Sequence, residues 1–277
     1  MKLPAIAVLG TMHGKADAIA PPLLQLGVSL VVPALDTDGF GTFTGEVPRK
    51  GTMLEAARAK ARAAIHVSGI PVGVATEGAY GPHPVLPFVP FGRELLLWLD
   101  TTTGQEIVEV IADEEPDFDQ VEVNTVGAAE AFLNRIDLSA TAVAVALRGA
   151  KPASVAKGLR ERAEVLAAVE KALARAGSSS VLVQTDMRAH CNRRRMRMIG
   201  RLANRLAERL STPCPACGAA GFGIVRHERG LPCSDCGTAT DLTRAAVRQC
   251  TVCAFEIQSP VADRPHASPA ECPACNP

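Results

Sequence analysis

The fold is decided by residues 51–76, which have the sequence GTMLEAARAKARAAIHVSGIPVGVAT. Thr52 and Glu55 have the spacing of a capping box at the start of a helix. Apolar residues then recur at helical spacing until Gly69, a residue type that commonly ends a helix. The apolar run PVGVAT at 71–76 is typical of a buried strand. A helix followed by a buried strand predicts a layered α/β fold.

Segments of alternating type continue on both sides of this stretch. Residues 94–113 contain two apolar runs around the turn TTTG, a pattern that predicts a hairpin. Further strands are expected at 5–10, 29–35, 71–76, 141–147 and 179–186, and helices at 14–27, 51–68, 125–136, 154–177 and 191–210. Residues 77–84, EGAYGPHP, are expected to form a loop. This alternation predicts an α/β protein with a layered mixed sheet flanked by helices.

Composition limits the classes of function. The 277 residues are 47% hydrophobic, which is enough for a sizeable core. The 29 basic and 29 acidic residues give a net charge of zero, so the whole chain has no general attraction to nucleic acids or anionic membranes. The longest apolar runs are far shorter than the ~20 residues of a membrane span, and the N-terminal segment resembles a first strand rather than a signal peptide. We expect a cytoplasmic protein with no membrane partner, and nucleic acid is not expected as its main partner.

The composition of the chain changes near Ser211. Beyond this residue the sequence is rich in Pro, Gly and Cys and has few large apolar residues, too few to fold without a metal. Eight of the nine cysteines fall here as four C-x-x-C pairs, and such pairs turn both sulfurs toward one tetrahedral zinc. These observations predict an α/β domain over 1–210 and a double zinc-ribbon domain, with four cysteines per zinc, over 211–277.

Four cysteine pairs predict two structural Zn²⁺ sites, but the spacing leaves the pairing open. Most simply, one zinc takes Cys214, Cys217, Cys233 and Cys236, and the other takes Cys250, Cys253, Cys272 and Cys275. An interleaved pairing is the alternative. Residues 211–277 hold five Arg, no Lys and six acidic residues, so with thiolate-bound zinc the tail is acidic, which argues against an electrostatic nucleic-acid module. Cys191 has no such partner and is expected to be a small buried thiol.

Polar residues just beyond the strand ends of an α/β sheet gather in one crevice, which directs attention to three segments. The first is GTMHGK at residues 10–15, which joins a strand to the start of a helix. Thr11, His13, Lys15 and backbone N–H groups there can bind an anion. The spacing does not match a phosphate loop, and an ordinary tight turn is the alternative.

The second segment is residues 76–83. Glu77 follows a buried apolar strand, where packing does not explain a charge, so it is a candidate metal ligand or base; a satisfied polar loop residue is the alternative. Upstream, Glu55 and Lys60 belong to the expected helix at 51–68, and carboxylates in this region could hold Mg²⁺. Glu55 is equally explained by the capping box, and Lys60 by a solvated helix face.

The third segment is residues 185–197, the first part of the stretch TDMRAHCNRRRMRMIGRLANRL at 185–206. In a helical projection, one side carries Arg194, Arg197, Arg201 and Arg205, which is typical of a solvated face. Four polar residues precede or begin the helix at the expected strand end: Asp186, Arg188, His190 and Arg193. Arginines at such a position can bind phosphate, so these four residues are candidates for contact with a substrate.

In their order along the chain, these motifs resemble the inosine-triphosphate pyrophosphatase-like superfamily, which includes the Maf proteins. TMHGK is similar to its phosphate turn, T-x-N-x-x-K, with Thr11 and Lys15 in similar places and His13 instead of the Asn. The block from EAARAK to VATEG is similar to its Glu-Asn-Ala-x-x-Lys helix and Asp-Asp-Ser-Gly strand end. The matching residues in that block are Glu55, Lys60 and Glu77, and AHCNRRR is similar to its Ser-His-Arg through His190 and Arg193.

This resemblance implies an inosine-triphosphate-pyrophosphatase-like fold and a Mg²⁺-dependent nucleoside triphosphate pyrophosphatase. Glu55 and Glu77 would be the catalytic residues that hold Mg²⁺, and a metal-bound water would attack a phosphoryl group. The nucleotide would be bound by Thr11, His13, Lys15, Lys60, Asp186, Arg188, His190 and Arg193.

The complete layout also looks like an uncharacterised bacterial domain family of unknown function, through GTFTGEVPRKG, TEGAYGPHP, TDMRAH and the cysteine pairs. That resemblance implies no activity. Two rival hypotheses therefore accompany nucleotide binding. One is a non-catalytic zinc-ribbon interaction protein that binds a protein or RNA partner through its tail and arginine helix. The other is a structural zinc module on an inactive enzyme scaffold.

Overall fold

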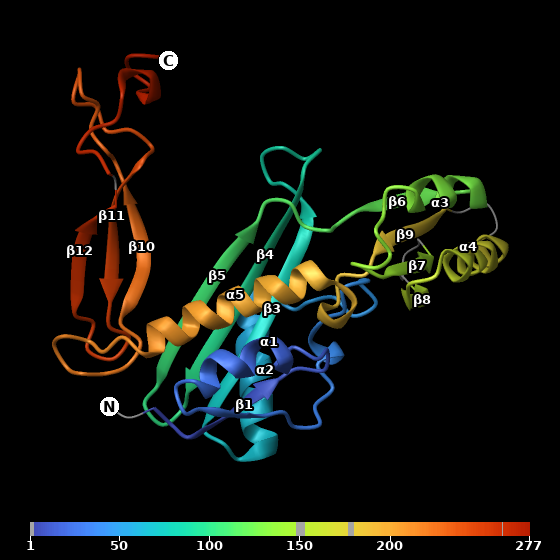
Figure 1. The fold of residues 1–277 in the computed structure, drawn as a ribbon, viewed down its shortest axis with the longest axis horizontal. Helices are drawn as coiled ribbons and strands as arrows, with labels where there is room; N and C mark the ends of the chain where they lie inside the picture. Colours follow the sequence, from blue (N-terminus) through green and yellow to red (C-terminus); the bar gives the residue numbers. More distant parts are fainter. Residues whose placement is uncertain (1–2, 148–152, 177–179, 262) are drawn as a thin grey trace. The chain divides into compact units, whose positions relative to one another are not determined.

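A computed structural model describes residues 3–147, 153–176, 180–261 and 263–277 and divides into two compact units (Figure 1). Pro4–Ala207 forms the first, here called the α/β unit, and Glu208–Pro277 belongs to the second, here called the tail unit. No helix among the described residues is long and apolar enough to cross a membrane.

The larger sheet of the α/β unit has five strands in the order β2-β1-β3-β4-β5. Their bounds are β1 Ile6–Gly10, β2 Ser29–Val31, β3 Val72–Pro82, β4 Pro90–Asp100 and β5 Gln105–Asp113. The strand β1 pairs in parallel with β2 and β3, whereas β3, β4 and β5 pair antiparallel. The expected mixed sheet and the hairpin at 94–113 are therefore present.

Helices cover both faces of this sheet. The helix α2, Met53–Ser68, begins with the expected capping box of Thr52 and Glu55 and ends at Gly69 in the left-handed conformation. It packs against Leu95 and Leu97 of β4. Because side chains alternate along a strand, Glu94, Leu96 and Trp98 of β4 point to the other face, where Glu94 meets a side chain of α5, Arg193–Leu210. The short helix α1, Ala16–Leu24, follows β1 and contains two prolines.

The smaller sheet has four antiparallel strands in the order β6-β9-β7-β8. Their bounds are β6 Gln120–Val123, β7 Val143–Leu147, β8 Ala153–Leu159 and β9 Val181–Thr185. A core that includes Val145, Val165, Val181 and Val183 joins one face of this sheet to α3, Val126–Leu133, and α4, Arg162–Ala176.

Two sequence predictions about element type are wrong. The expected loop at 77–84 is largely strand, because β3 continues to Pro82 and pairs with β4 along its whole length. The single helix expected at 154–177 is the strand β8 followed by α4. The helix expected at 191–210 begins at Arg193, after a short 3-10 turn, Ala189–Cys191.

The tail unit is built on one antiparallel sheet of three strands, in the order β10-β11-β12. Their bounds are β10 Gly223–Arg229, β11 Thr243–Gln249 and β12 Glu256–Pro260. Cysteines make up half of its small core cluster, since Cys214 and Cys250 pack with Ala219 and Phe222. The tail unit thus has few apolar contacts with which to stabilise its fold.

Candidate functional site

The α/β unit contains a polar cavity of about 470 Å³. Strands of both sheets, together with residues at the starts of helices, contribute to its wall. The lining residues include Thr11, His13, Lys15, Thr37, Asp38, Arg49, Lys60, Glu77, Tyr80, Gln120, Lys157, Gln184, Met187, Arg188 and Arg195. The three polar segments selected from the sequence therefore converge on one cavity, as strand ends do in α/β sheets.

Lys15 is the least compensated charge of the cavity. It precedes α1, is 6% exposed, and donates from Nζ to the Thr76 carbonyl oxygen at 3.2 Å. Among the described residues, no carboxylate oxygen lies within 4.0 Å of Nζ. Burial and then the neighbouring charge of Arg195 lower the pKa of Lys15 to about 7, although Glu94 opposes them. A buried ammonium without a counter-ion favours the binding of an anion.

Glu77 lies on the side of β3 that faces α2, two residues after the core residue Ala75. Its carboxylate contacts Nζ of Lys60 on α2 and lies 3.4 Å from Nη2 of Arg49. Oε1 of Glu77 is buried, and within the described part of the chain it accepts no aligned hydrogen bond, so Lys60 compensates it by charge alone. Glu77 is therefore held by two cations.

Arg195 is a cavity residue that the sequence analysis missed. It is 8% exposed, its Nε donates to Glu94 Oε1, and its Nη1 donates to the carbonyl of Met187. The Tyr80 hydroxyl donates to the same Glu94 oxygen at 2.7 Å. Burial would lower the pKa of Arg195, but Glu94 holds it above its ordinary value. The contact between Glu94 and Arg195 requires a glycine at position 78, because a Cβ at Gly78 would lie 2.4 Å from Glu94 Oε1.

Arg188 lines the cavity, but its neighbour Asp186 does not. The Asp186 carboxylate is fully buried and accepts hydrogen bonds from the Arg188 side chain and backbone and from the Gly158 N–H. Burial would raise the pKa of Asp186, but these bonds lower it. Asp186 thus positions Arg188, and its predicted contact with a substrate stays a prediction. Cys191 is buried as expected, and burial raises the pKa of its thiol to about 11.

The predicted histidines lie together near one side of the cavity. Their ring centroids are 5.1 Å apart, and Nε2 of His13 is 3.4 Å from Asp38 Oδ1. Burial lowers the pKa of His13 to about 4, against the attraction of Asp38. His13 lines the cavity, whereas His190 is exposed beside it. Arg193 is also exposed and is not among the residues of the cavity wall, so its contact with a substrate stays a prediction.

Glu77 lines the cavity and Glu55 does not, and the catalytic role predicted for the two carboxylates stays a prediction. Glu55 is exposed, and its Oε2 accepts hydrogen bonds from the Thr52 backbone N–H and hydroxyl at 2.7 and 2.9 Å. The capping box therefore accounts for it. Within the described residues, no carboxylate cluster has the geometry of a metal site, so the expected Mg²⁺ finds no support.

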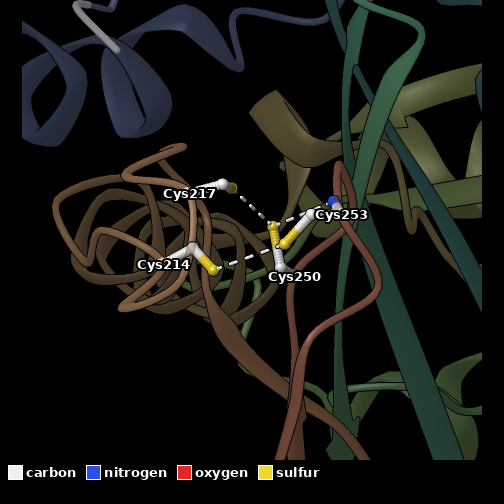
Figure 2. A group of neighbouring side chains, drawn as sticks. All are labelled: Cys214, Cys217, Cys250 and Cys253. Carbon is white, nitrogen blue, oxygen red and sulfur yellow. Dashed lines mark hydrogen bonds between the residues drawn. The ribbon is translucent and has the colours of Figure 1, made fainter.

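The tail unit contains two groups of four cysteines in which all ligand sulfurs lie within 4.8 Å of one another. The first comprises Cys214, Cys217, Cys250 and Cys253 (Figure 2), and the second comprises Cys233, Cys236, Cys272 and Cys275. Several sulfur–sulfur distances are given by the structure: 3.7 Å for two pairs in the first group and 3.5 to 3.8 Å in the second. A tetrahedral zinc with Zn–S bonds of 2.3 Å requires about 3.8 Å, so each group could hold a zinc ion.

The grouping is interleaved, so the simplest predicted pairing is wrong. The first C-x-x-C pair precedes β10 and the second follows it, and a strand of seven residues spans roughly 23 Å. Those two pairs therefore cannot share one ion. Because β10 and β11 are antiparallel, the start of β10 lies beside the end of β11, which brings Cys214 close to Cys250 and Cys253. The described cysteines form no disulfide.

The fold and the sites define a mixed α/β protein with a cationic cavity and a tail with two candidate four-cysteine zinc sites. Over residues 60–277 the chain matches the family described as Domain of unknown function (DUF6671), and it belongs to that family. No curated protein and no solved structure matches the chain. The resemblance to the inosine-triphosphate pyrophosphatase-like superfamily is not confirmed and stays a prediction.

Proposed function

We propose that the cavity of the α/β unit binds a phosphorylated small molecule, and that a nucleotide is its ligand. The single observation that carries this proposal is Lys15, a buried ammonium in a cavity wall with no carboxylate partner among the described residues. The proposed binding site comprises the predicted residues that line the cavity: Thr11, His13, Lys15, Lys60, Glu77 and Arg188.

The charge of the wall supports an anionic ligand. Its described lining includes the cations Lys15, Arg49, Lys60, Lys157, Arg188 and Arg195 but only the carboxylates Asp38 and Glu77. Several cations have partners within the protein, such as Glu46 for Lys157 and Glu94 for Arg195. Lys15 remains, at the N-terminus of α1, which has no side-chain cap. The helix dipole adds to its attraction for a phosphate.

Binding is better supported than hydrolysis. Of the two carboxylates predicted to hold Mg²⁺, only Glu77 lines the cavity, and Lys60 and Arg49 already neutralise it. A nucleoside triphosphate pyrophosphatase would need Glu77 to exchange a cation for the metal. The assay is release of pyrophosphate from nucleoside triphosphates with Mg²⁺, in which activity that Glu77→Gln abolishes would establish turnover.

The binding test is calorimetry of the full zinc-loaded chain with four nucleoside triphosphates and inorganic tripolyphosphate. We expect at least one of these anions to bind, and Lys15→Met to weaken its binding at least tenfold. The matched control is Lys171→Met, which removes an exposed lysine of α4 that does not line the cavity. No binding by the wild type, or equal losses in both variants, would refute the proposal.

A second candidate function is the docking of a protein partner by the tail unit. Its sheet leaves Ile224, Val225 and Ile257 between 39 and 43% exposed. Arg226 and Arg244 are ion-paired with Glu256 and Glu228, so the tail favours an apolar protein surface over RNA. The variant Ile224→Ser/Ile257→Ser should abolish capture of a protein partner without loss of bound zinc, whereas binding of RNA by the wild-type tail would contradict this choice.

A further inference from the structure

The cavity has two chemically different walls. The wall built by β3, α1 and α2 carries Lys15, Lys60 and Glu77. The wall built by β6 and β9 carries the carboxamides of Gln120 and Gln184 instead. The nearby cations Lys157 and Arg188 also line the cavity, but each is paired with a carboxylate of the protein. A ligand that fills both walls would have a charged end and an uncharged end that forms hydrogen bonds.

The fold places the two glutamines side by side. Gln120 and Gln184 are directly opposite in the antiparallel ladder of β6 and β9. Side chains alternate along each strand, and Val121 and Val183, the adjacent pair, belong to the core covered by α3 and α4. Both carboxamides therefore project from the face of the sheet that the helices do not cover. This face lines the cavity.

Gln184 presents hydrogen-bonding groups that the described protein does not use. The residue is only 5% exposed and lies in an otherwise apolar strand, Val181–Thr185. Its side chain forms no hydrogen bond with any described residue, and neither does that of Gln120. Glu77 Oε1 is the one buried side-chain N or O atom without a partner among the described residues, so the Gln184 amide atoms are accessible from the cavity. A carboxamide offers one acceptor and two donor hydrogens, which need partners from water or a ligand.

The chemistry of a carboxamide narrows the ligand. A glutamine pairs in a bidentate manner with a group that has a donor and an acceptor on adjacent atoms, as the edges of nucleobases do. Phe118 lines the same cavity and offers an apolar contact for a planar ring. Phosphates and sugar hydroxyls lack this paired edge.

We propose that Gln184, with Gln120 beside it, recognises the edge of a nucleobase and determines which nucleotide the cavity accepts. This inference rests on the proposed nucleotide binding. It further specifies that the base of the nucleotide contacts the wall of β6 and β9. The cationic wall then supplies affinity for phosphates of any nucleotide, and the glutamines supply selectivity among the bases.

The experiment compares each nucleoside triphosphate with inorganic tripolyphosphate, which has the charge but no base. Calorimetry is performed on the full zinc-loaded chain as wild type, Gln184→Leu and Gln120→Leu, with Gln25→Leu as the matched control at an exposed glutamine outside the cavity. We expect the preferred nucleotide to bind more tightly than tripolyphosphate. Gln184→Leu should weaken that nucleotide about tenfold to a hundredfold and leave tripolyphosphate unchanged.

The outcomes separate this inference from the proposed function. Binding of tripolyphosphate with no preference for any nucleotide would overturn the role of the glutamines and leave the anion site standing. Equal losses for both ligands in Gln184→Leu, with no selective loss in Gln120→Leu, would also overturn it. Failure of all five ligands to bind would overturn the proposed function, and the inference with it.

Discussion

Lys15 and Arg195 are both buried cations at the cavity, but the protein compensates them differently. Glu94 pairs with Arg195 and holds its charge, whereas among the described residues Lys15 has only the Thr76 carbonyl as a hydrogen-bond partner. The unfolded chain would bind a proton at Lys15 up to about pH 10.5, but the folded protein would do so only up to about pH 7. The unfolded state thus binds more protons between these values, so Lys15 makes the stability of the ligand-free protein rise with pH across this window.

The same pKa predicts how ligand affinity depends on pH. An anion needs the protonated form of Lys15, which is the minor form above pH 7 in the empty protein. We expect the affinity for tripolyphosphate to fall by up to about tenfold per pH unit above pH 7, with uptake of a proton on binding. Calorimetry in buffers of different ionisation enthalpy measures that uptake. An affinity that stays constant from pH 7 to 9 would contradict it, and Lys15→Met should lose the pH dependence.

Glu94 is expected to be among the most important charged residues for stability. Its side chain is fully buried, forms an ion pair with Arg195, and accepts hydrogen bonds from the hydroxyls of Tyr80 and Thr76. Glu94→Gln would leave the Arg195 guanidinium buried without a counter-charge, which costs about 3–5 kcal/mol in such pairs. Urea denaturation measures the free energy of unfolding, and Glu114→Gln, at an exposed site, is the control. A loss below about 1 kcal/mol would mean that the pair contributes little.

The residues that the sequence analysis missed share one signal. Arg195 lies four and seven residues before Ile199 and Leu202, on the buried face of α5, and the helical projection left it unassigned. Gln184 is likewise a polar residue at a core position of an apolar strand. Glu77 was recognised by this same criterion. A functional role for polar residues within apolar patterns could therefore have been predicted from the sequence. Their interaction partners could not, because those contacts join residues far apart in the chain.

At the scale of elements, periodicity predicted well where one pattern persisted. The helix α2 and the β4–β5 hairpin have long, regular apolar patterns, and both are present with bounds close to those expected. The predictions failed where a strand has turn-forming residues, as in the last part of β3, Glu77–Pro82, or where it adjoins a helix, as β8 adjoins α4. Pairing with β4 outweighs the local preference of the glycines in β3.

Cysteine pairing is also decided at this scale, because strand length and direction determine which pairs meet. Two double variants test the interleaved arrangement. Cys217→Ser/Cys253→Ser removes two ligands from one group, and we expect one tightly bound zinc to remain. Cys217→Ser/Cys236→Ser removes one ligand from each group and should weaken both sites. Zinc content per chain after dialysis, measured by mass spectrometry, distinguishes the two arrangements, since sequential pairing predicts the reverse result.

At the scale of the whole molecule, the two units differ in what stabilises them. The α/β unit has extensive apolar cores on both of its sheets, including the chain's single tryptophan, Trp98, which is 1% exposed. The tail unit has a core in which cysteines replace large apolar side chains, as Cys214 and Cys250 do beside Phe222. Zinc binding would then supply the folding free energy that apolar burial supplies elsewhere.

This difference predicts a selective effect of metal removal. A strong chelator should unfold the tail unit, because without zinc its minimal apolar core leaves too little folding free energy. The α/β unit should stay folded, so the fluorescence of Trp98 and the affinity for tripolyphosphate should not change. Limited proteolysis with mass spectrometry should then show cleavage after about residue 208 in the chelated protein only, and added Zn²⁺ should restore protection. If chelation shifted the Trp98 emission or abolished anion binding, the α/β unit would depend on the zinc sites for its fold. The proposed nucleotide site would then form only in the zinc-loaded protein.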